Sequence, residues 1–411
     1  MRVVVVGAGP AGASLALALA RAGIATTLVE AASNFDRELR GEALMPSGLE
    51  ALGALGLAPI DAAVPQRALA GWAVAVQGRL LFELDEPLGA SDEPACTLVN
   101  QTAWLERLLC PAARPNSLTL LTGQPVKQLL RHDDNSSPAR VSGVTLATGQ
   151  QLQADLVVAC DGRGSLLRRL AGLALIGQDS PIDVLWFRYA DTPTAPPLAG
   201  RFYTLVGDEG IGSLFCNASG RVQLGWVIDH RAPTPVRSAA EWSARLASQA
   251  PPQLASWLLA NADYVTAPVR LSVQVGMAER WWQPGLLLLG DAAHPMSPVR
   301  AQGINGALRD AAVAARQLIE LAQPLAPGAS PPPAAIDARL AAIEAERRPE
   351  VSQLQILQAE ELRRGELLRQ APALRCLLAA TAPLLGGLIG RRWRSQQLQL
   401  RKGINRLTVR P

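Results

Sequence analysis

Cysteine and histidine are scarce in this chain of 411 residues, which has five cysteines and three histidines. The cysteines are odd in number, lie far apart and form no C-x-x-C pair, so neither a disulfide framework nor a zinc site is expected. We therefore expect reduced thiols and no bound metal.

Long uninterrupted apolar runs and blocks of one charge are also lacking. The opening MRVVVVGAGPAG has only four valines before a glycine, which is too short for the apolar part of a signal peptide. No segment reaches the roughly 18 consecutive apolar residues of a membrane-spanning helix. The net charge of +4 is spread along the chain, which argues against a nucleic-acid partner. These absences predict a cytoplasmic protein.

Apolar residues are abundant overall, at 49% of the chain, and are sufficient for a large core. A chain of this length exceeds the size at which one core stops growing, so two domains or one elaborated domain are expected.

The first thirty residues predict a strand, a tight turn, a helix and a second strand. The valines of 3–6 are typical of a strand buried on both faces, and GAGPAG at 7–12 follows directly. An Ala/Leu-rich helix then leads to a second strand over 24–29, which ends at an acidic residue. This order is typical of a dinucleotide-binding unit.

Each small residue of this turn has its own expected role. Gly7 permits the tight turn, Gly9 lets the backbone approach a pyrophosphate, and Gly12 lets the helix pack closely on the sheet. The acidic residue after the second strand can accept hydrogen bonds from a ribose and disfavours a 2′-phosphate. The turn therefore predicts FAD or NAD, without distinguishing between them, and the expected contacts are Gly7, Gly9, Ala11, Gly12 and Glu30.

Two later motifs follow apolar strands. DLVVACDGRGSLLRRLAG at 155–172 contains an Asp-Gly pair, and GLLLLGDAAHPMSPVRAQGINGALRDA at 285–311 contains a Gly-Asp pair. Together with GAGPAG and with RGEALMPSGL at 40–49, their order and spacing resemble the flavoprotein monooxygenases of the p-hydroxybenzoate hydroxylase class. The resemblance covers most of the chain to about residue 350.

The resemblance implies an α/β fold, in which a doubly wound GxGxxG dinucleotide-binding domain carries an inserted antiparallel β-sheet substrate domain and is followed by C-terminal helices. The expected FAD-binding domain comprises residues 1–75, 96–180 and 269–345. The expected substrate domain comprises residues 76–95 and 181–268, and the helical segment is 346–411.

The resemblance also assigns residues to FAD. Asp291, at a strand end, would accept a hydrogen bond from a ribityl hydroxyl, and Asp161 would hold its loop near the cofactor. Backbone amides at the start of the next helix would face the pyrimidine edge of the flavin. The remaining FAD contacts that it implies are Arg40, Gln101, Gly303, Ile304 and Asn305.

Two positions near the expected flavin have no assigned catalytic role. Pro298 lies in the loop after the Gly-Asp motif, and Arg300 stands where relatives have a small or apolar residue. Arg300 would either bind an anionic substrate or turn to solvent. Relatives often have glycine where Ala301 stands.

The expected activity is that of an FAD-dependent monooxygenase reduced by NADH or NADPH. The resemblance implies hydroxylation or epoxidation of a mostly apolar, aromatic or polyketide/quinone-like small molecule, with O2 activated as a flavin C4a-hydroperoxide. Short strands over about 181–268 hold many of the aromatic residues, and Phe202 and Trp226 are candidates for the substrate pocket. With only three tyrosines, a tyrosine relay for phenol activation is not evident.

Alternatives stay open. A flavin-dependent reductase or halogenase would share the scaffold, although GWVID at 225–229 lacks the halogenase W-x-W-x-I-P segment. A non-catalytic FAD-binding protein is a third reading. ALRCLLAATAPLLGGLIGRRWRSQQ at 373–397 fits either a helix packed over the flavin domain or a peripheral membrane contact. The sequence does not determine the oligomeric state.

Overall fold

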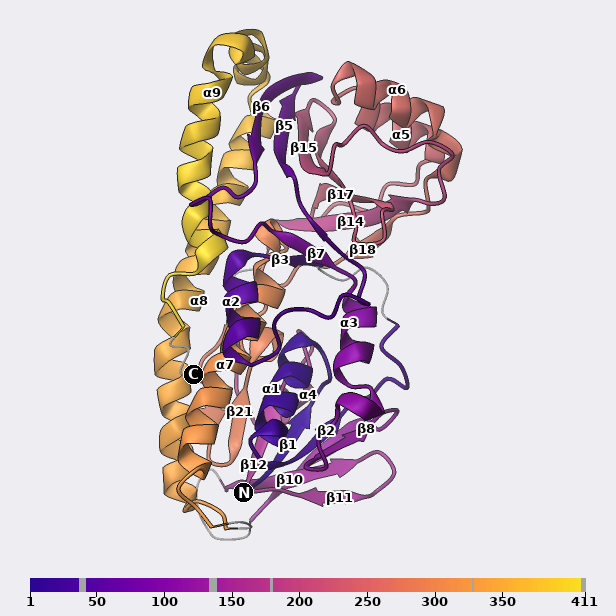
Figure 1. Cartoon of the computed structure of the whole chain (residues 1–411). Coiled ribbons are helices and arrows are strands. Elements are labelled where there is room, and N and C mark those ends of the chain that lie inside the picture. The colour runs from indigo at the N-terminus through magenta and orange to yellow at the C-terminus, as the bar shows by residue number, and fades with distance from the viewer. Residues whose placement is uncertain (37–41, 133–138, 178–179, 327–328, 408–411) are drawn as a thin grey trace.

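The computed structural model describes residues 1–36, 42–132, 139–177, 180–326 and 329–407, and it contains two main sheets beside a long helical hairpin (Figure 1). The first sheet has six strands. The edge strand formed by residues 282–283 is antiparallel to its neighbour, and the other five strands are parallel. In spatial order they are β20 (Trp282–Gln283), β21 (Leu286–Leu288), β12 (Leu156–Ala159), β1 (Arg2–Val6), β2 (Ala25–Val29) and β8 (Leu118–Leu121).

This sheet is buried on both faces, as the run of valines predicts. Val3 and Val5 of β1 pack with helices α1 (Pro10–Arg21) and α7 (Gln302–Ala322), whereas Val4 and Val6 pack with residues of the opposite face. That second face is covered by a three-stranded sheet of β9 (Val126–Arg131), β10 (Val141–Leu146) and β11 (Gln151–Gln153).

The second main sheet has seven strands and is antiparallel except for the pair formed by β5 and β15. In spatial order its strands are β18 (Val269–Leu271), β14 (Ile182–Tyr189), β17 (Val222–Asp229), β16 (Gly210–Cys216), β15 (Arg201–Gly207), β5 (Gly71–Val76) and β6 (Arg79–Asp85). Helices α5 (Ala239–Ala247) and α6 (Pro252–Ala260) cover one of its faces. Residues 71–75 and 269–271, which the sequence assigns to the FAD-binding domain, therefore belong to this sheet.

Smaller elements join the two sheets, and Figure 1 shows β3 and β7 between them. Some of these elements carry site residues and others extend the covering layers. They are β3 (Ala43–Leu44), β4 (Gln66–Ala68), β7 (Thr97–Val99), β13 (Leu175–Ile176), β19 (Met277–Ala278), α2 (Pro46–Ala54), α3 (Gln101–Leu108) and α4 (Leu166–Leu170).

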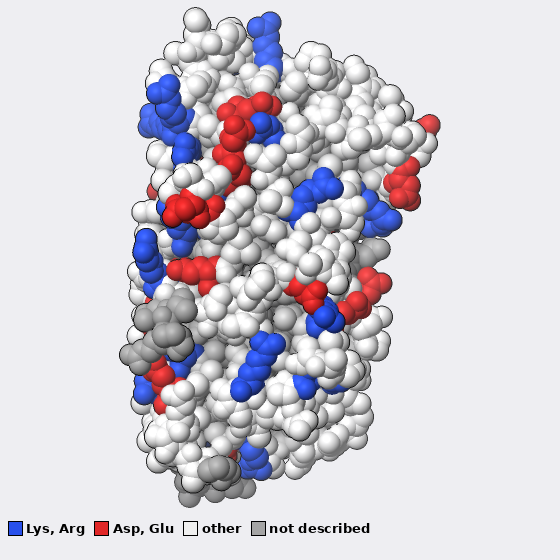
Figure 2. Space-filling model, in the orientation of Figure 1, with Lys and Arg blue, Asp and Glu red and all other residues white. Residues whose placement is uncertain are grey.

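The chain ends in a hairpin of two long helices, α8 (Pro333–Gln370) and α9 (Pro372–Lys402). Helix α8 runs past both main sheets without a break at residue 346, and α9 returns along the seven-stranded sheet (Figure 1). On the face shown in Figure 2, charged side chains of both signs are scattered among uncharged areas. The predicted α/β fold with an inserted antiparallel sheet and C-terminal helices is confirmed.

Candidate functional site

The predicted motifs converge at one edge of the parallel sheet. Strands β1, β2, β12 and β21 run in the same direction, so their carboxyl ends lie side by side. A motif begins directly after each of these strands. The residues in question are Gly7 after β1, Glu30 after β2, Asp161 after β12, and Gly290 and Asp291 after β21.

The glycine turn after β1 has no room for a side chain at Gly7 or at Gly12. Gly7 has a left-handed φ of +99°, and a Cβ there would lie 2.3 Å from the carbonyl oxygen of Cys160. A Cβ at Gly12 would lie 1.9 Å from the carbonyl oxygen of Gly7. A Cβ at Gly9 would meet nothing within 4 Å, so the start of α1 faces open space. Free amides and the positive end of a helix dipole bind phosphates in such a place.

Glu30 closes the other side of this turn. Its buried carboxylate accepts hydrogen bonds from the backbone nitrogens of Ala8, at 2.7 Å, and Ala32, at 3.0 Å. The acid is therefore fixed at the strand end where a ribose is expected. Gln101 is the first residue of α3 and is half-buried, and Arg40 lies outside the described residues.

The Asp-Gly and Gly-Asp loops are tied to each other. Asp161 accepts hydrogen bonds from the Ser165 hydroxyl, at 2.6 Å, and from the backbone nitrogen of Leu167, at 3.1 Å, so it fixes the start of α4. Arg168 is buried and donates to the carbonyl oxygen of Ala292, at 2.7 Å. Asp291 pairs with Arg163 at 3.3 Å.

The first turn of α7 lies beside Asp291. A Cβ at Gly303 would be 3.7 Å from the Oδ1 atom of Asp291. The next residue, Ile304, is half-buried, and Asn305 is buried. The Asn305 amide accepts a hydrogen bond from the backbone nitrogen of Met45, at 2.9 Å, and donates to the carbonyl oxygen of Ala43, at 3.0 Å. Asn305 thereby joins α7 to β3.

Gly290 brings the first and last motifs together. A Cβ at Gly290 would lie 3.8 Å from the Cβ of Ala11, in the first turn of α1, and 3.1 Å from the Cβ of Ala307, in α7. The late acidic strand end therefore packs against the opening turn, as one shared dinucleotide requires. The family model described as "FAD binding domain" matches residues 1–354.

The chain belongs to this family of FAD-binding monooxygenases. It is 34% identical over 329 residues to a 6-methylpretetramide 4-monooxygenase of Streptomyces rimosus, with 77% of this chain and 75% of the relative covered. It is 26% identical to a 3-demethoxyubiquinol 3-hydroxylase of Escherichia coli (strain K12), with 75% and 77% covered. The structure of PqsL from P. aeruginosa in complex with 2-aminobenzoylacetate superposes with a TM-score of 0.74, at 22% identity, over 92% of this chain and 98% of that one.

The residues present fit the cofactor of this FAD-binding family. The open space over Gly9, the fixed acid after β2 and the half-exposed acid beside α7 occupy one continuous edge of the sheet. Gly162 and Gly164 also face open space, because a Cβ at either would meet nothing within 4 Å. The protein is an FAD-dependent monooxygenase, and NAD(P)H is the reductant typical of its family.

A buried ionic cluster that was not predicted from the sequence supports the Gly-Asp loop on the side away from α1 and the expected cofactor. We define this Asp310 cluster as His294, Asp310, Arg347 and Glu350. Asp310 accepts hydrogen bonds from the backbone nitrogen of Gly290, at 3.0 Å, and from Arg347 Nε, at 2.8 Å, and it lies 2.6 Å from His294 Nε2. Burial alone would raise the pKa of Asp310, but the charges of His294 and Arg347 lower it to about 2.

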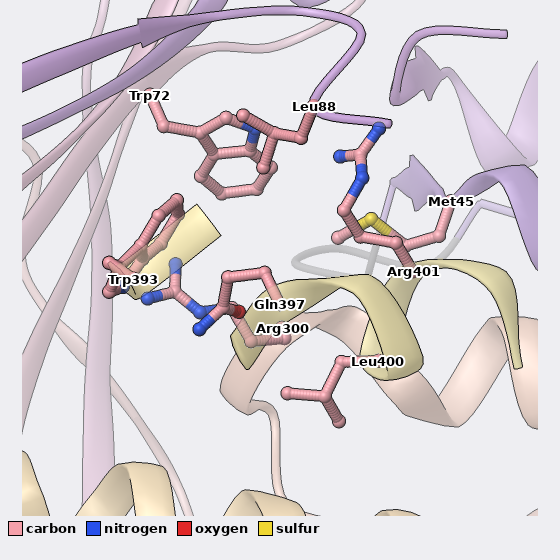
Figure 3. Close-up of a pocket in the computed structure, with 8 residues that line it drawn as sticks. All are labelled: Met45, Trp72, Leu88, Arg300, Trp393, Gln397, Leu400 and Arg401. Atoms are coloured by element: carbon pink, nitrogen blue, oxygen red, sulfur yellow. The ribbon is translucent and has the colours of Figure 1, made fainter. Parts of the chain in front are cut away.

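Arg300 takes neither of the two positions that the sequence allowed. Its guanidinium pairs with Glu361 at 2.5 Å and lies 4.7 Å from the ring centre of Trp393 and 5.5 Å from that of Trp72. Figure 3 shows Arg300 with Trp72 and Trp393 in a small pocket where α9 meets β5 and the loop before α7. Arg300 is thus neither turned to solvent nor free for an anionic substrate. The preceding Pro298 is exposed.

The two candidate pocket residues lie on opposite faces of the seven-stranded sheet. Phe202 stacks on Phe215, with ring centres 5.2 Å apart, on the face that also contacts Ala301. Trp226 packs against Trp242 of α5, with ring centres 5.7 Å apart, in the core on the other face. The structure therefore brings Phe202, and not Trp226, to the side of the cofactor site.

Glu42 is an acid at this junction that the sequence did not single out. It follows the undescribed residues 37–41, is half-buried, and accepts a hydrogen bond from the backbone nitrogen of Ala218 at 3.3 Å. Ala218 belongs to the turn between β16 and β17, so the carboxyl group lies where β3 meets the end of the second sheet. Burial raises the pKa of Glu42 to about 7, because the effect of burial is larger than the lowering effect of the hydrogen bond from Ala218.

Substituting Glu42 should change how stability depends on pH. The pKa is raised in the folded state, so the folded chain binds more protons between about pH 4.5 and 7, and the free energy of unfolding falls as the pH rises through this window. The expected decrease is at most about 3 kcal/mol. Glu42→Gln should flatten this dependence in urea titrations at pH 5 and 8. If the free energy of unfolding of the variant depended on pH as strongly as that of the native chain, the raised pKa of Glu42 would be contradicted.

Proposed function

We propose that this enzyme inserts one oxygen atom of O2, by hydroxylation or epoxidation, into a mostly apolar aromatic, polyketide-like or quinone-like molecule, with NADH or NADPH as reductant. The observation that carries the proposal is an aromatic face, which we define as Trp72, Trp186, Phe202 and Phe215. This aromatic face belongs to the same apolar cluster as Ala301, directly before α7. A flat apolar molecule would be held between such a face and the cofactor site.

The names of the relatives agree with a substrate of this kind. A 6-methylpretetramide 4-monooxygenase and a 3-demethoxyubiquinol 3-hydroxylase are both named for the oxygenation of an organic molecule, which in the second case is a ubiquinol. The Arg300 guanidinium beside Trp72 is already paired with Glu361, and the indole of Trp186 donates a hydrogen bond to Gln223 at 2.5 Å. Recognition is therefore expected to rest on shape and apolar contact rather than on ion pairing.

When bound, FAD supplies the transfer of electrons from NAD(P)H to O2 and of one oxygen atom to the substrate. The chain contributes position, exclusion of water and fixed charge. The amides at the start of α1 would hold phosphates, and Asp291 would accept a hydrogen bond from a hydroxyl. The amides at the start of α7 favour negative charge on a group bound against them. The aromatic face would exclude water from a substrate bound in front of α7.

The test of the proposed function uses the purified holoenzyme with NADH and NADPH in separate assays and a panel of aromatic, polyketide-like and quinone-like compounds. We expect consumption of NAD(P)H and O2 with a product heavier by one oxygen atom. A reductase would instead yield a product with two added hydrogens without O2, and a halogenase would require halide. A protein that retains FAD but consumes no O2 with any compound would contradict the proposal.

Phe202→Ala should weaken substrate binding, because a ring stacked in the aromatic face is lost. The expected rise in KM is about tenfold to a hundredfold, with more NAD(P)H consumed without product. The matched control is Trp226→Phe, which alters a ring in the same sheet but on the face covered by α5. An equal rise in KM in both variants would show that the sheet as a whole, and not this face, determines binding.

A further inference from the structure

The outer surface of α9 is apolar although it is not covered by the rest of the chain. Among the described residues, α9 is the one helix long and apolar enough to cross a membrane, yet only 28% of its apolar window is buried. Leu384 is 84% exposed and Leu388 is 60% exposed. The exposed leucines are Leu374, Leu377, Leu384, Leu385 and Leu388, and we call them the α9 leucine stripe.

The α9 leucine stripe is fixed in its outward direction by the opposite side of the helix. That side packs on β6 through glycines, since a Cβ at Gly386 would lie 2.1 Å from the carbonyl oxygen of Leu81. A Cβ at Gly390 would lie 3.2 Å from the Phe82 side chain. Because the backbone of α9 approaches β6 so closely, only this side fits against the sheet. The leucines therefore cannot turn inward without separating α9 from β6.

The charges on α9 are all of one sign. The helix contains no Asp or Glu between residues 372 and 402. Arg391 and Arg392 are exposed, follow Leu388 by about one helical turn and continue the same side of the helix. Neither arginine forms an ion pair within the part of the chain that the structure describes. A leucine stripe that ends in free cations is typical of a helix lying in a membrane interface.

We propose that the α9 leucine stripe, with Arg391 and Arg392, binds the surface of a lipid bilayer that carries anionic headgroups. The leucines would enter the boundary of the acyl chains, and the arginines would lie at the lipid phosphates. The exposed leucines extend along about 21 Å of helix, from Leu374 to Leu388. Soluble proteins rarely expose an apolar patch of this extent unless it binds a partner or a membrane.

The charge pattern favours lipid over a second copy of the chain. If two copies paired through this stripe, each would bring two arginines and no acidic residue from α9, so the cations would be buried without partners. An anionic bilayer provides both an apolar layer and the counter-charge. The inference concerns where the enzyme is held and does not depend on which molecule it oxygenates.

The proposal is tested by flotation of the FAD-loaded full chain with vesicles of phosphatidylcholine, alone or mixed with phosphatidylglycerol. We expect binding to the mixed vesicles and much weaker binding to phosphatidylcholine alone. The double variant Leu384→Glu and Leu388→Glu should lose at least about tenfold in vesicle binding. The double variant Arg391→Glu and Arg392→Glu should lose the preference for anionic lipid.

The matched control is Leu259→Glu, which changes a leucine of similar exposure, 54%, on α6. It should bind vesicles as the native chain does. Flavin content and thermal unfolding of each variant confirm that it folds, and turnover without vesicles tests the proposed function separately. The proposal is overturned if the native chain fails to float with either vesicle or if the leucine variant floats equally well. Dissociation of a native dimer by the leucine variant, seen by light scattering, would also overturn it.

Discussion

Gly12→Ala should lower the affinity for FAD by about a hundredfold or more, because a single methyl group at this position breaks the turn that faces the phosphates. The added Cβ would lie 1.9 Å from the carbonyl oxygen of Gly7 and 3.1 Å from the Cβ of Cys160. Gly7 has little room to move, since even a Cβ added to it would lie 2.3 Å from the carbonyl oxygen of Cys160. Helix α1 must therefore move away from β1 and take its first amides with it. Flavin content after purification, and FAD titration of the apoprotein, measure the effect.

The matched control for this change is Gly53→Ala. Gly53 is also a helical glycine, in α2, but a Cβ there would meet nothing within 4 Å. The control should keep full FAD binding and gain about 0.5–1 kcal/mol of stability, because alanine favours a helix over glycine. Normal FAD affinity in Gly12→Ala would show that the turn does not hold the cofactor as inferred.

Asp310→Ala should reduce the free energy of unfolding by about 3–5 kcal/mol. Asp310 is completely buried, and its removal leaves the equally buried Arg347 with Glu350 as its remaining acidic partner in the Asp310 cluster. It also leaves the backbone nitrogen of Gly290 without its acceptor, so the Gly-Asp loop loses its support. Urea unfolding of the apoprotein measures the stability loss directly, and FAD affinity should fall as well.

Acid titration gives a second measure of the same residue. Since the pKa of Asp310 is lowered to about 2 in the fold, its contribution is complete above about pH 3.8 and is lost as the pH falls toward 2. The variant should lack this part of the acid sensitivity. Asp61→Ala, which breaks a surface ion pair with Arg107, is the control and should leave stability nearly unchanged. Equal stability losses in the two variants would contradict the role given to the cluster.

The parts of the site that are local in sequence could be predicted from the sequence. Each of the glycine turn, the Asp-Gly pair and the Gly-Asp pair directly follows an apolar strand, so strand direction alone places them at one edge. The Asp310 cluster could not be predicted in this way. Its members come from the Gly-Asp loop, α7 and α8, and nothing in the spacing of His294, Asp310 and Arg347 indicates that they meet.

Other details depended on the register of strands and on contacts between distant segments. Successive residues of a strand point to opposite faces, so an aromatic residue at an unknown register, such as Trp226, is assigned to either face with equal reason. Arg300 adopts a left-handed φ of 58°, which is uncommon for residues other than glycine, and its aromatic partners come from β5 and α9. That α9 packs closely on β6 could be learned only from the structure, through the contact of Gly386 with Leu81.

Helix α8 has a mechanical consequence for the whole enzyme. Its 38 residues extend for about 57 Å, and along that length it packs against α7 and β20 and also against β15 and β16. Because this one helix packs against both sheets, a displacement of one sheet would be transmitted to the other. Separating the two sheets would require α8 to bend or to detach from one of them, so we expect small molecules to enter and leave through local rearrangements of loops and side chains.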